Sequence, residues 1–308
     1  MKQTFSPRVS GIEISGIRRI FEAAGPGSIN LGLGQPDFNT PQHIKDAAIQ
    51  AIKEGKTGYT ANTGIPELRD AICAKFKKEN GLSCTPDQLI VTAGASEALH
   101  IVMQALVSDG NKVLCADPGF VSYQALATLA GGRPVGVPLD ETFHINVEAA
   151  KELMTGARLM VLNSPANPTG AVEPKESIKA VVESAADAGV TVVSDEVYEH
   201  FIYGKKHWSA ARFGDNVITI NAASKTYAMT GCRLGYLLAS TEIIGQCLKV
   251  HQYCQACATS ISQYAALAAY TGDQHMVGVM RDEYRARRDL LWNGLAKLGF
   301  SFPEPEGA

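Results

Sequence analysis

A lysine among small residues is the first candidate for chemistry in this chain. Lys225 lies in the stretch "NAASKTYAMTGCRLGYLLAS" (residues 221–240), followed by an arginine, Arg233, with a glycine two residues away on either side. A desolvated lysine near other cations has a lowered pKa, and its free amine can form a Schiff base. An arginine can hold a phosphate through two parallel hydrogen bonds, and Gly231 and Gly235 indicate close approach to something bound. The alternative is a solvated lysine without a catalytic role.

An aspartate at the end of an apolar run is the second candidate. Asp195 follows "VTVVS" and precedes "EVYEH", in which Tyr198 lies three residues further on. A carboxylate buried at such a point needs a cationic partner, because its desolvation is otherwise costly. If its strand neighbours the strand before Lys225, about 4.8 Å away, the two side chains lie beside each other. The alternative is a buried aspartate that only caps the next turn.

Two further polar groups follow apolar runs. After "LIVT", the residues Gly94, Ala95 and Ser96 open a helix, whose free amides and dipole can bind an anion, above all a phosphate. The alternative there is an ordinary serine N-cap. After "LMVLN", Asn167 precedes Pro168, which keeps its backbone out of the helical region and directs its amide toward a ligand oxygen. The alternative there is a plain Asn-Pro turn.

These groups together describe a site for pyridoxal 5'-phosphate. That coenzyme needs a lysine for its aldehyde, an anion-binding site for its phosphate and an acid at its pyridine nitrogen. The sequence has neither a Walker loop nor a G-x-G-x-x-G motif after a strand, so ATP and dinucleotides receive no support. Each clue alone has a simpler alternative, and the conjunction of all of them favours the coenzyme.

The apolar runs before these residues predict the elements that position them. Such runs, rich in β-branched residues, lie at 89–92, 112–116, near 133, and at 157–163, 189–194, 216–221 and 235–240. They alternate with helix-like segments, which begin at Ser96, Ser122 and about Lys175. This alternation predicts an α/β fold with a mostly parallel sheet between two layers of helices. Ligands of such sheets bind beyond the carboxyl ends of the strands, which is where the candidate residues lie.

Three parts are expected along the chain. Residues 1–44 are predicted to form an N-terminal arm and a segment of a small domain, and residues 45–280 the large domain with the sheet. Residues 281–308 begin a further part of the small domain with a long amphipathic helix. The final "GFSFPEPEGA" has a strand-like start and no partner strand, so it reads as an unfinished element.

Composition and charge exclude several classes of partner. The chain has 308 residues and a net charge of -3, which gives no basic field for nucleic acid. No stretch approaches the roughly 20 apolar residues of a membrane span, and the N-terminus has no apolar signal core, so a cytoplasmic location is expected. Seven cysteines, an odd number scattered through apolar segments, suit reduced thiols better than a disulfide framework.

One group of cysteines and a histidine has helical spacing, which raises the question of zinc. Cys247, His251, Cys254 and Cys257 would lie along one stripe of a helix, about 15 Å long. A tetrahedral site needs four ligand atoms about 2.0–2.3 Å from one ion. Packing or an interface therefore explains this stripe better than a metal, and no metal is expected.

The sequence resembles the class I aminotransferases, fold type I of the pyridoxal phosphate enzymes, in particular archaeal and bacterial aspartate and aromatic aminotransferases. The likeness runs from about Arg8 to the last residue. Its motifs, in order, are "LGLGQPDFNTP", "GKTGYTANTGIPELRDAI", "DPGFVSY", "NSPANPTGAV", "VVSDEVYEHFIY" and "SKTYAMTGCRLGY". This resemblance implies a seven-stranded, mostly parallel sheet in the large domain, a second and smaller domain, and a homodimer with shared active sites.

The resemblance also implies a role for each site residue. Lys225 would carry the coenzyme as a Schiff base and shuttle the proton at the substrate α-carbon, and Asp195 would pair with the protonated ring nitrogen. The other implied cofactor contacts are Asn167 and Tyr198 at the ring hydroxyl, Ala95, Ser96 and Arg233 at the phosphate, Phe120 on the ring face, and Tyr59 at the phosphate of the neighbouring subunit. Ser224 is also implied to bind the cofactor, and Gly34, Asn167 and Phe120 are implied to lie around the substrate. Tyr198 is counted with Lys225 and Asp195 as catalytic.

The chain departs from the family pattern in a few places. Ala222 and Cys232 replace a phosphate-binding serine and a tryptophan of many relatives, and Phe120 replaces a common tryptophan. By the resemblance, relatives continue for roughly 80 residues beyond "PEGA" and supply there an arginine for the substrate carboxylate. The chain is therefore expected to be a fragment of a working enzyme.

The implied activity is transfer of the amino group of an L-amino acid, with aspartate or aromatic donors favoured, to a 2-oxo acid such as 2-oxoglutarate. Two alternatives remain at this point. The coenzyme could instead serve a β-lyase, or the fold could be a non-catalytic domain that senses a ligand. The sequence does not decide the amino donor, because side-chain specificity depends on a few positions around the substrate.

Overall fold

The computed structural model describes residues 5–14, 16, 19, 23, 25, 27–29, 32 and 34–308. Part of the expected N-terminal segment, residues 1–44, therefore lies outside the described residues. Within the described part, no helix is both long enough and apolar enough to cross a lipid bilayer. The domain boundaries expected at residues 44 and 280 stay predictions.

A seven-stranded sheet forms the centre of the described chain. Its strands are β1 (Leu89–Thr92), β2 (Lys112–Asp117), β3 (Arg133–Pro138), β4 (Ala157–Asn163), β5 (Thr191–Asp195), β6 (Val217–Ala222) and β7 (Gly235–Leu238). They lie in the order β1-β7-β6-β5-β4-β2-β3. Only β7 pairs antiparallel, with β1 on one side and β6 on the other, so the sheet is mostly parallel as predicted.

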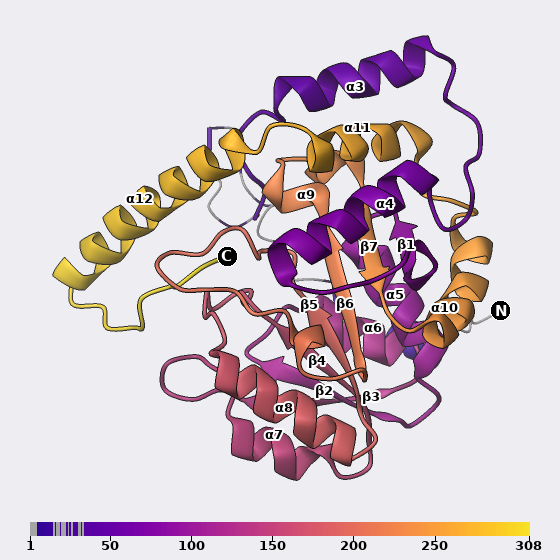
Figure 1. Cartoon of the computed structure of the whole chain (residues 1–308). Helices are drawn as coiled ribbons and strands as arrows, with labels where there is room; N and C mark the ends of the chain where they lie inside the picture. The colour runs from indigo at the N-terminus through magenta and orange to yellow at the C-terminus, as the bar shows by residue number, and fades with distance from the viewer. Residues whose placement is uncertain are drawn as a thin grey trace.

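Helices cover both faces of this sheet (Figure 1). The longer helices are α3 (Gln42–Lys53), α4 (Pro66–Lys75), α5 (Ala95–Leu106), α6 (Ser122–Leu129), α7 (Val147–Met154), α8 (Lys175–Asp187), α10 (Thr241–Cys254), α11 (Ser260–Thr271) and α12 (His275–Lys297). The short helical segments are α1 (Pro7–Ser10), η1 (Phe76–Asn80), η2 (Pro86–Gln88), η3 (Ala210–Arg212), α9 (Ala223–Thr226) and η4 (Thr230–Cys232).

The core forms because alternate residues of each strand point to opposite faces. In β4, Leu159 and Val161 pack with α5, α6 and α10 in one apolar cluster. Met160 and Leu162 pack on the other face with α7 and α8. A third cluster joins α3, α4 and α11 to β1 and β7 on that same face. Strands that are buried on both faces need uninterrupted apolar sequence, which explains the runs seen in the chain.

Strand register collects the candidate residues at one edge of the sheet. Asn163, the last residue of β4, is the Cα partner of Asp195, the last residue of β5. Asp195 in turn pairs with Ile220 of β6, which ends at Ala222 and leads directly into α9. Because β7 runs antiparallel to its neighbours, its first residue lies at this edge: Gly235 pairs with Thr92, the last residue of β1.

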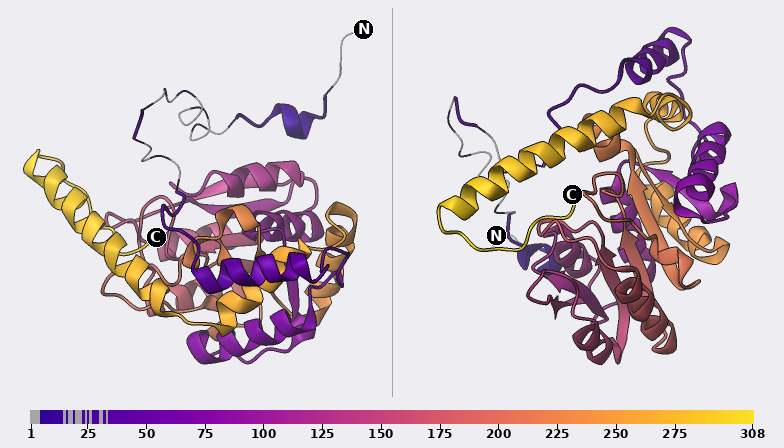
Figure 2. Two further views of the ribbon diagram at one scale, coloured as in Figure 1. Left: turned by 90° about the horizontal axis from the view of Figure 1, so that it is seen from above. Right: turned by 60° about the vertical axis from the view of Figure 1, so that its left-hand side comes forward.

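The C-terminal part differs from the strand-like element expected from residue 299. Helix α12 projects from the end of α11, and the segment after it returns to the sheet domain without forming a strand (Figure 2). Gly307 forms only an isolated antiparallel bridge with Ile202. The backbone amides of Glu306 and Gly307 both donate to the carbonyl oxygen of Gly170, 2.8 Å away, so irregular contacts replace a strand ladder.

Candidate active site

A cavity of about 650 Å³ lies at the edge of the sheet where the strand ends meet. Ten of the eleven residues singled out from the sequence line it: Gly34, Ala95, Ser96, Phe120, Asn167, Asp195, Tyr198, Ser224, Lys225 and Arg233. The eleventh, Tyr59, lies outside this cavity and is 90% exposed. Residues far apart in the sequence thus meet in one place, whereas Tyr59 faces solvent in the single chain.

Lys225 reaches the cavity from α9, the single helical turn after β6. Its Nζ donates a hydrogen bond to the carbonyl oxygen of Gly34, 2.5 Å away, and lies 5.6 Å from the centre of the Tyr198 ring. Burial, together with the positive charge of Arg233, lowers the pKa of Lys225, and the negative charge of Asp195 opposes this shift only in part. The amine is therefore easier to deprotonate than that of a solvated lysine.

Asp195 is a buried carboxylate that lines the cavity. Its Oδ2 accepts a hydrogen bond from the hydroxyl of Tyr123 at 2.9 Å, and its Oδ1 accepts one from the amide of Val197 at 3.3 Å. Burial raises its pKa to about 6 in spite of these bonds. Lys225 is not an ion-pair partner: its positive charge favours the ionised form of Asp195, but no lysine, arginine or histidine among the described residues forms an ion pair with this carboxylate. A cationic ligand atom would supply what the protein leaves out.

The amides at the start of α5 form a candidate anion-binding turn together with Arg233. The N-cap residue is Gly94, at φ +84°, and no described side chain caps the helix, so Ser96 is not an N-cap. The Arg233 guanidinium donates to the carbonyl oxygen of Ala93 at 3.5 Å and to that of Thr230 at 3.0 Å. We call residues 93–96 the anion turn. The amides of Ala95 and Ser96, the helix dipole and the guanidinium all favour a phosphate there, whereas the amides of Ala93 and Gly94 already donate to Glu97 and Thr92.

The glycines on either side of Arg233 have different surroundings. A Cβ on Gly235 would lie 2.5 Å from both the amide nitrogen of Ala95 and the carbonyl carbon of Gly94. A Cβ on Gly231 would meet nothing within 4 Å. Gly235 therefore allows close approach of the protein's own backbone, whereas no described atom lies near the Cβ position of Gly231, and approach of a bound molecule to either glycine stays a prediction.

A pair of alanine substitutions tests this packing. We expect Gly235→Ala to lower the free energy of unfolding by roughly 2 kcal/mol, because the backbone of the anion turn must move to admit the methyl group. Gly231→Ala, two residues before Arg233, is expected to change it by less than about 0.5 kcal/mol. Urea denaturation of both variants measures the difference. Equal values would show that the close approach at Gly235 carries no energetic weight.

Asn167 and Tyr198 lie side by side beyond the ends of β4 and β5. The Asn167 side-chain amide donates to the Tyr198 hydroxyl at 3.5 Å, and the Asn167 backbone amide donates to Oδ1 of Asn163 at 2.8 Å. Burial raises the pKa of Tyr198 to about 12, so the hydroxyl keeps its proton and can donate it in a hydrogen bond. Both side chains can therefore donate to an acceptor in the cavity.

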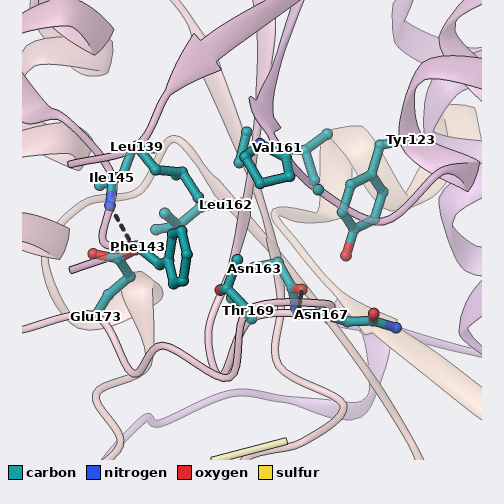
Figure 3. Close-up of a pocket in the computed structure, with 14 residues that line it drawn as sticks. Tyr123, Leu139, Phe143, Ile145, Val161, Leu162, Asn163, Asn167, Thr169 and Glu173 are labelled. Carbon is teal, nitrogen blue, oxygen red and sulfur yellow. Dashed lines mark hydrogen bonds between the residues drawn. The ribbon is translucent and has the colours of Figure 1, made fainter. Parts of the chain in front are cut away.

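A smaller cavity of about 20 Å³ lies behind Asn167 (Figure 3). Figure 3 shows Tyr123 and Asn167 on one side of it and Glu173 on the other. Glu173 accepts a hydrogen bond from the amide of Ile145 at 2.9 Å, and burial raises its pKa to about 7. A space of this size holds about one water molecule, so it is too small for a substrate.

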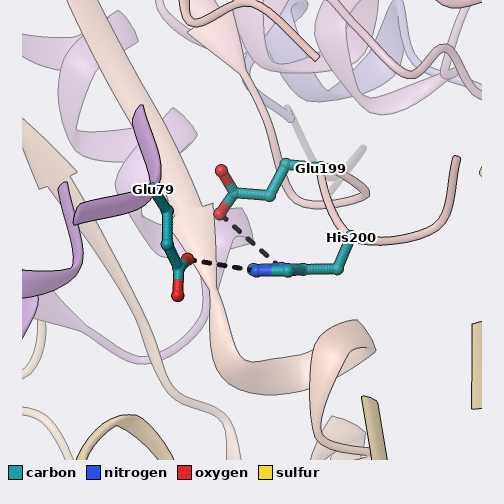
Figure 4. Close-up of side chains that lie close together, drawn as sticks. All are labelled: Glu79, Glu199 and His200. Atoms are coloured by element: carbon teal, nitrogen blue, oxygen red, sulfur yellow. Dashed lines mark hydrogen bonds and ion pairs between the residues drawn. The ribbon is translucent and has the colours of Figure 1, made fainter. Parts of the chain in front are cut away.

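A buried network of charges supports the segment that carries Asp195 and Tyr198. Glu199 forms an ion pair with Lys75 of α4 and accepts hydrogen bonds from Asn80 at 2.7 Å and Asn221 at 2.5 Å. His200 lies between Glu79 and Glu199, and Figure 4 shows its ring facing both carboxylates. Burial opposes ionisation of Glu199, but Lys75 and the neighbouring histidines hold its pKa well below the usual value.

This network gives a stability prediction. We expect Lys75→Met to lower the free energy of unfolding by about 3–5 kcal/mol, because it leaves the buried Glu199 carboxylate without its cation. Lys78→Met, which removes an exposed lysine three residues further on, is the matched control and is expected to have little effect. Urea denaturation at neutral pH compares the two variants. Similar losses for both would mean that the ion pair of Lys75 and Glu199 is not a support of the fold.

The residues once considered for zinc have other partners. Cys247 is buried in the apolar cluster with α5, and Cys254 is exposed. His251 is fully buried between Glu97 and the backbone of Asn62. The groups of described residues close enough to share an ion are instead Glu79 with Glu199 and His200, and Glu196 with Glu199 and His207. Lys75 already pairs with the Glu199 that both groups share, so neither group is read as a metal site.

Three aromatic residues of the cavity, Tyr123, Phe201 and Tyr284, were missed from the sequence. Tyr123, from α6, donates the hydrogen bond to Asp195 described above, and Tyr284, from α12, also lines the cavity, with its ring centre 5.1 Å from that of Phe201. Tyr123 belongs to the "DPGFVSY" motif, and its place in the first turn of the helix after β2 was an available signal. Tyr284 gave no such signal, because α12 does not follow a strand of the sheet.

Comparisons with known proteins agree with this geometry. The family described as aminotransferase class I and II matches residues 26–308. The "Probable aspartate aminotransferase" of Methanocaldococcus jannaschii is 48% identical over 310 residues, which are 98% of this chain and 82% of that protein. Aromatic-amino-acid aminotransferase 2 of Thermococcus litoralis is 38% identical over 98% of this chain and 81% of its own length.

Solved structures give the same answer for the fold. The aspartate aminotransferase of Thermus thermophilus, solved with maleate, superimposes with a TM-score of 0.96 at 38% identity, covering 99% of this chain and 84% of that one. Sequence family and fold therefore agree over nearly the whole chain, and the residues at the strand ends form one cavity. The chain belongs to the class I and II aminotransferases and is an enzyme that transfers amino groups.

Proposed function

We propose that this enzyme uses pyridoxal 5'-phosphate, bound in the 650 Å³ cavity, to move the amino group of an L-amino acid to a 2-oxo acid such as 2-oxoglutarate. One observation carries the proposal. Asp195 is buried without a cationic partner among the described residues, in the same cavity as a lysine whose pKa is lowered. A protonated ring nitrogen of the cofactor would pair with the Asp195 carboxylate, and the cofactor aldehyde would react with the Lys225 amine.

The anion turn fits the phosphate of this cofactor. The amides of Ala95 and Ser96, the hydroxyl of Ser224 and the guanidinium of Arg233 are the groups that would hold it. Gly94 permits this arrangement, because a Cβ there would lie 2.6 Å from a terminal nitrogen of Arg233. Ala222, which also lines the cavity, has no hydroxyl to add to this set. Arg233 would thus hold the phosphate, and Lys225 would remain free to react.

When bound, the cofactor supplies an aldehyde that condenses with amines and a ring that withdraws electrons from the substrate α-carbon. Lys225 would hold the aldehyde carbon, and its Nζ, once displaced by the substrate amine, would accept the proton from the substrate α-carbon. Asp195 would keep a proton on the ring nitrogen, and Tyr123 would hold the Asp195 carboxylate in place through its 2.9 Å hydrogen bond. Tyr198 and Asn167 would donate hydrogen bonds to the ring hydroxyl.

The remaining cavity walls would orient the ring and the substrate. Phe120 lies in the wall with its ring centre 5.5 Å from that of Tyr123 in an edge-to-face arrangement, and its ring is the group that would stack on the cofactor. Gly34 would approach the substrate carboxylate, and its carbonyl oxygen already accepts a bond from Lys225. Attachment of the cofactor aldehyde to Lys225 would therefore replace that bond before a substrate arrives.

Two finer parts of the proposal rest on the relatives. Aspartate and aromatic amino acids are the proposed donors, because the relatives named above carry those names. A homodimer with shared active sites is proposed, in which Tyr59 reaches the cofactor phosphate of the neighbouring subunit. Its 90% exposed side chain is available for such a contact.

A panel of amino donors tests the proposal. The protein is loaded with pyridoxal 5'-phosphate and mixed in turn with aspartate, tyrosine, phenylalanine and alanine, and the cofactor absorbance is followed as the amino group arrives. A full cycle with 2-oxoglutarate should then yield glutamate. Release of pyruvate or ammonia in place of glutamate would assign a lyase, and unchanged absorbance with every donor would reject the proposal.

A further inference from the structure

His251 of α10 lies between two acceptors. Its Nδ1 is 2.8 Å from Oε1 of Glu97, and its Nε2 is 2.9 Å from the backbone carbonyl oxygen of Asn62. The histidine side chain has no exposed surface, and Glu97 is the one carboxylate of the described residues that forms an ion pair with it. Water therefore has no access to replace either partner.

The hydrogen-bond partners of His251 determine how many protons the pair of Glu97 and His251 holds. A carbonyl oxygen only accepts, so Nε2 of His251 must carry a proton. Nδ1 then either donates to an ionised Glu97 or accepts from a protonated one. In both cases the pair of Glu97 and His251 holds the same number of protons and has no net charge. Loss of the shared proton would leave two acceptors facing each other 2.8 Å apart in a buried place.

Glu97 connects this histidine to the anion turn. It lies in the first turn of α5, directly after Ser96, and its Oε2 accepts a hydrogen bond from the amide of Ala93 at 2.5 Å. An unneutralised carboxylate in this turn would repel a phosphate bound at the same helix end. The proton shared with His251 removes that repulsion, and the bond to Ala93 holds the start of the turn.

Asn62 connects the same histidine to the loop that carries Tyr59. Three hydrogen bonds hold this loop. The carbonyl oxygen of Asn62 accepts from His251, and the side-chain amide of Asn62 donates to the carbonyl oxygen of Ala256. The hydroxyl of Thr60 accepts from the side-chain amide of Gln263 at 2.9 Å. One buried ring thus joins the anion turn of its own site to the loop proposed to reach the neighbouring site.

We propose that His251 is a positioning residue for the cofactor phosphate: the proton that it shares with Glu97 neutralises and holds the anion turn, while its other ring nitrogen holds the Tyr59 loop. This inference rests on the proposed function, because it takes the anion turn as the phosphate site. It assigns to a residue outside the cavity a part of the affinity for phosphate.

The test compares binding of pyridoxal 5'-phosphate with binding of pyridoxal, which lacks the phosphate. Both affinities are measured by titrating the cofactor-free full chain. The ratio of the affinity for pyridoxal 5'-phosphate to the affinity for pyridoxal reports the anion turn alone. We expect His251→Leu to lower this ratio about ten-fold, since Glu97 is left as a buried, unpaired carboxylate. If the leucine variant does not fold, His251→Gln, which can keep only one of the two bonds, is expected to lower the ratio about three-fold.

Glu97→Gln is the matched variant. Its side-chain amide can donate to Nδ1 of a neutral His251 while its oxygen still accepts from Ala93, so every hydrogen bond survives without the shared proton. The ratio should therefore stay within about two-fold of the unmodified value, as it should for Cys254→Ser on the same helix.

The outcomes separate this inference from the proposed function. An unmodified protein that binds neither compound, or both equally, would reject the proposed phosphate site itself. If the unmodified protein prefers pyridoxal 5'-phosphate and the histidine variants keep the same ratio, the role of His251 is rejected. Loss of both affinities in equal proportion would likewise reject it, because a general structural defect has no preference for the phosphate.

Discussion

Replacing Lys225 by alanine is expected to lower the rate of amino-group transfer by about 10⁴-fold or more, because the enzyme loses both its attachment point for the cofactor and its base. The anion turn and Asp195 are untouched, so pyridoxal 5'-phosphate should still bind, but without a covalent link. Borohydride reduction followed by peptide mapping should find the cofactor on residue 225 in the unmodified protein and on no peptide in the variant.

The control for this experiment is Lys249→Ala, because this lysine is exposed on α10 and its amine donates a hydrogen bond to Gln246. This variant should keep both the transfer rate and the label on residue 225. A labelled lysine elsewhere in the Lys225→Ala protein would refute the assignment of Lys225.

Replacing Asp195 by asparagine is expected to change activity and stability in opposite directions. The rate should fall roughly 10³-fold, because asparagine cannot hold a proton on the ring nitrogen by charge. The cofactor-free protein should become more stable at pH 8, by up to about 3 kcal/mol, since a buried carboxylate without a cation is removed. Steady-state rates and urea denaturation measure the two effects.

The pH dependence follows from the raised pKa of Asp195. Because the folded state holds this proton more tightly than the unfolded state, with a pKa of about 6 against the usual 3.8, burial of Asp195 reduces stability above pH 6. The gain in the asparagine variant should thus shrink as the pH falls from 7 to 4. Asp187→Asn, at the exposed end of α8, is the control and should show no such gain. A gain that is independent of pH would contradict the explanation.

Much of the fold follows from the sequence, because strands buried on both faces require continuous apolar runs. The predicted runs at 157–163 and 89–92 coincide with β4 and β1, while β5 begins two residues later than predicted and includes Asp195. A polar residue can belong to this ladder because its backbone pairs with Asn163. The antiparallel direction of β7 could not be predicted, since local patterns do not encode which way neighbouring strands run.

Site residues that directly follow a strand could be predicted from the sequence. Contacts between segments that are distant in the sequence could not. Lys225 and Arg233 lie beyond their strands as expected, and both line the cavity. Asp195 takes its hydrogen bond from Tyr123, 72 residues away, and not from a cation, because tertiary contact and not spacing brings that hydroxyl to it. The close contact at Gly235 is likewise a matter of two backbones meeting, which single-sequence patterns do not reveal.

Electron density for the protein bound to pyridoxal 5'-phosphate tests the central claim most directly. The account predicts density joining Nζ of Lys225 to the cofactor, with the ring nitrogen at the Asp195 carboxylate and the phosphate at the anion turn and Arg233. A cofactor bound outside this cavity, or one whose ring nitrogen points away from Asp195, would contradict it.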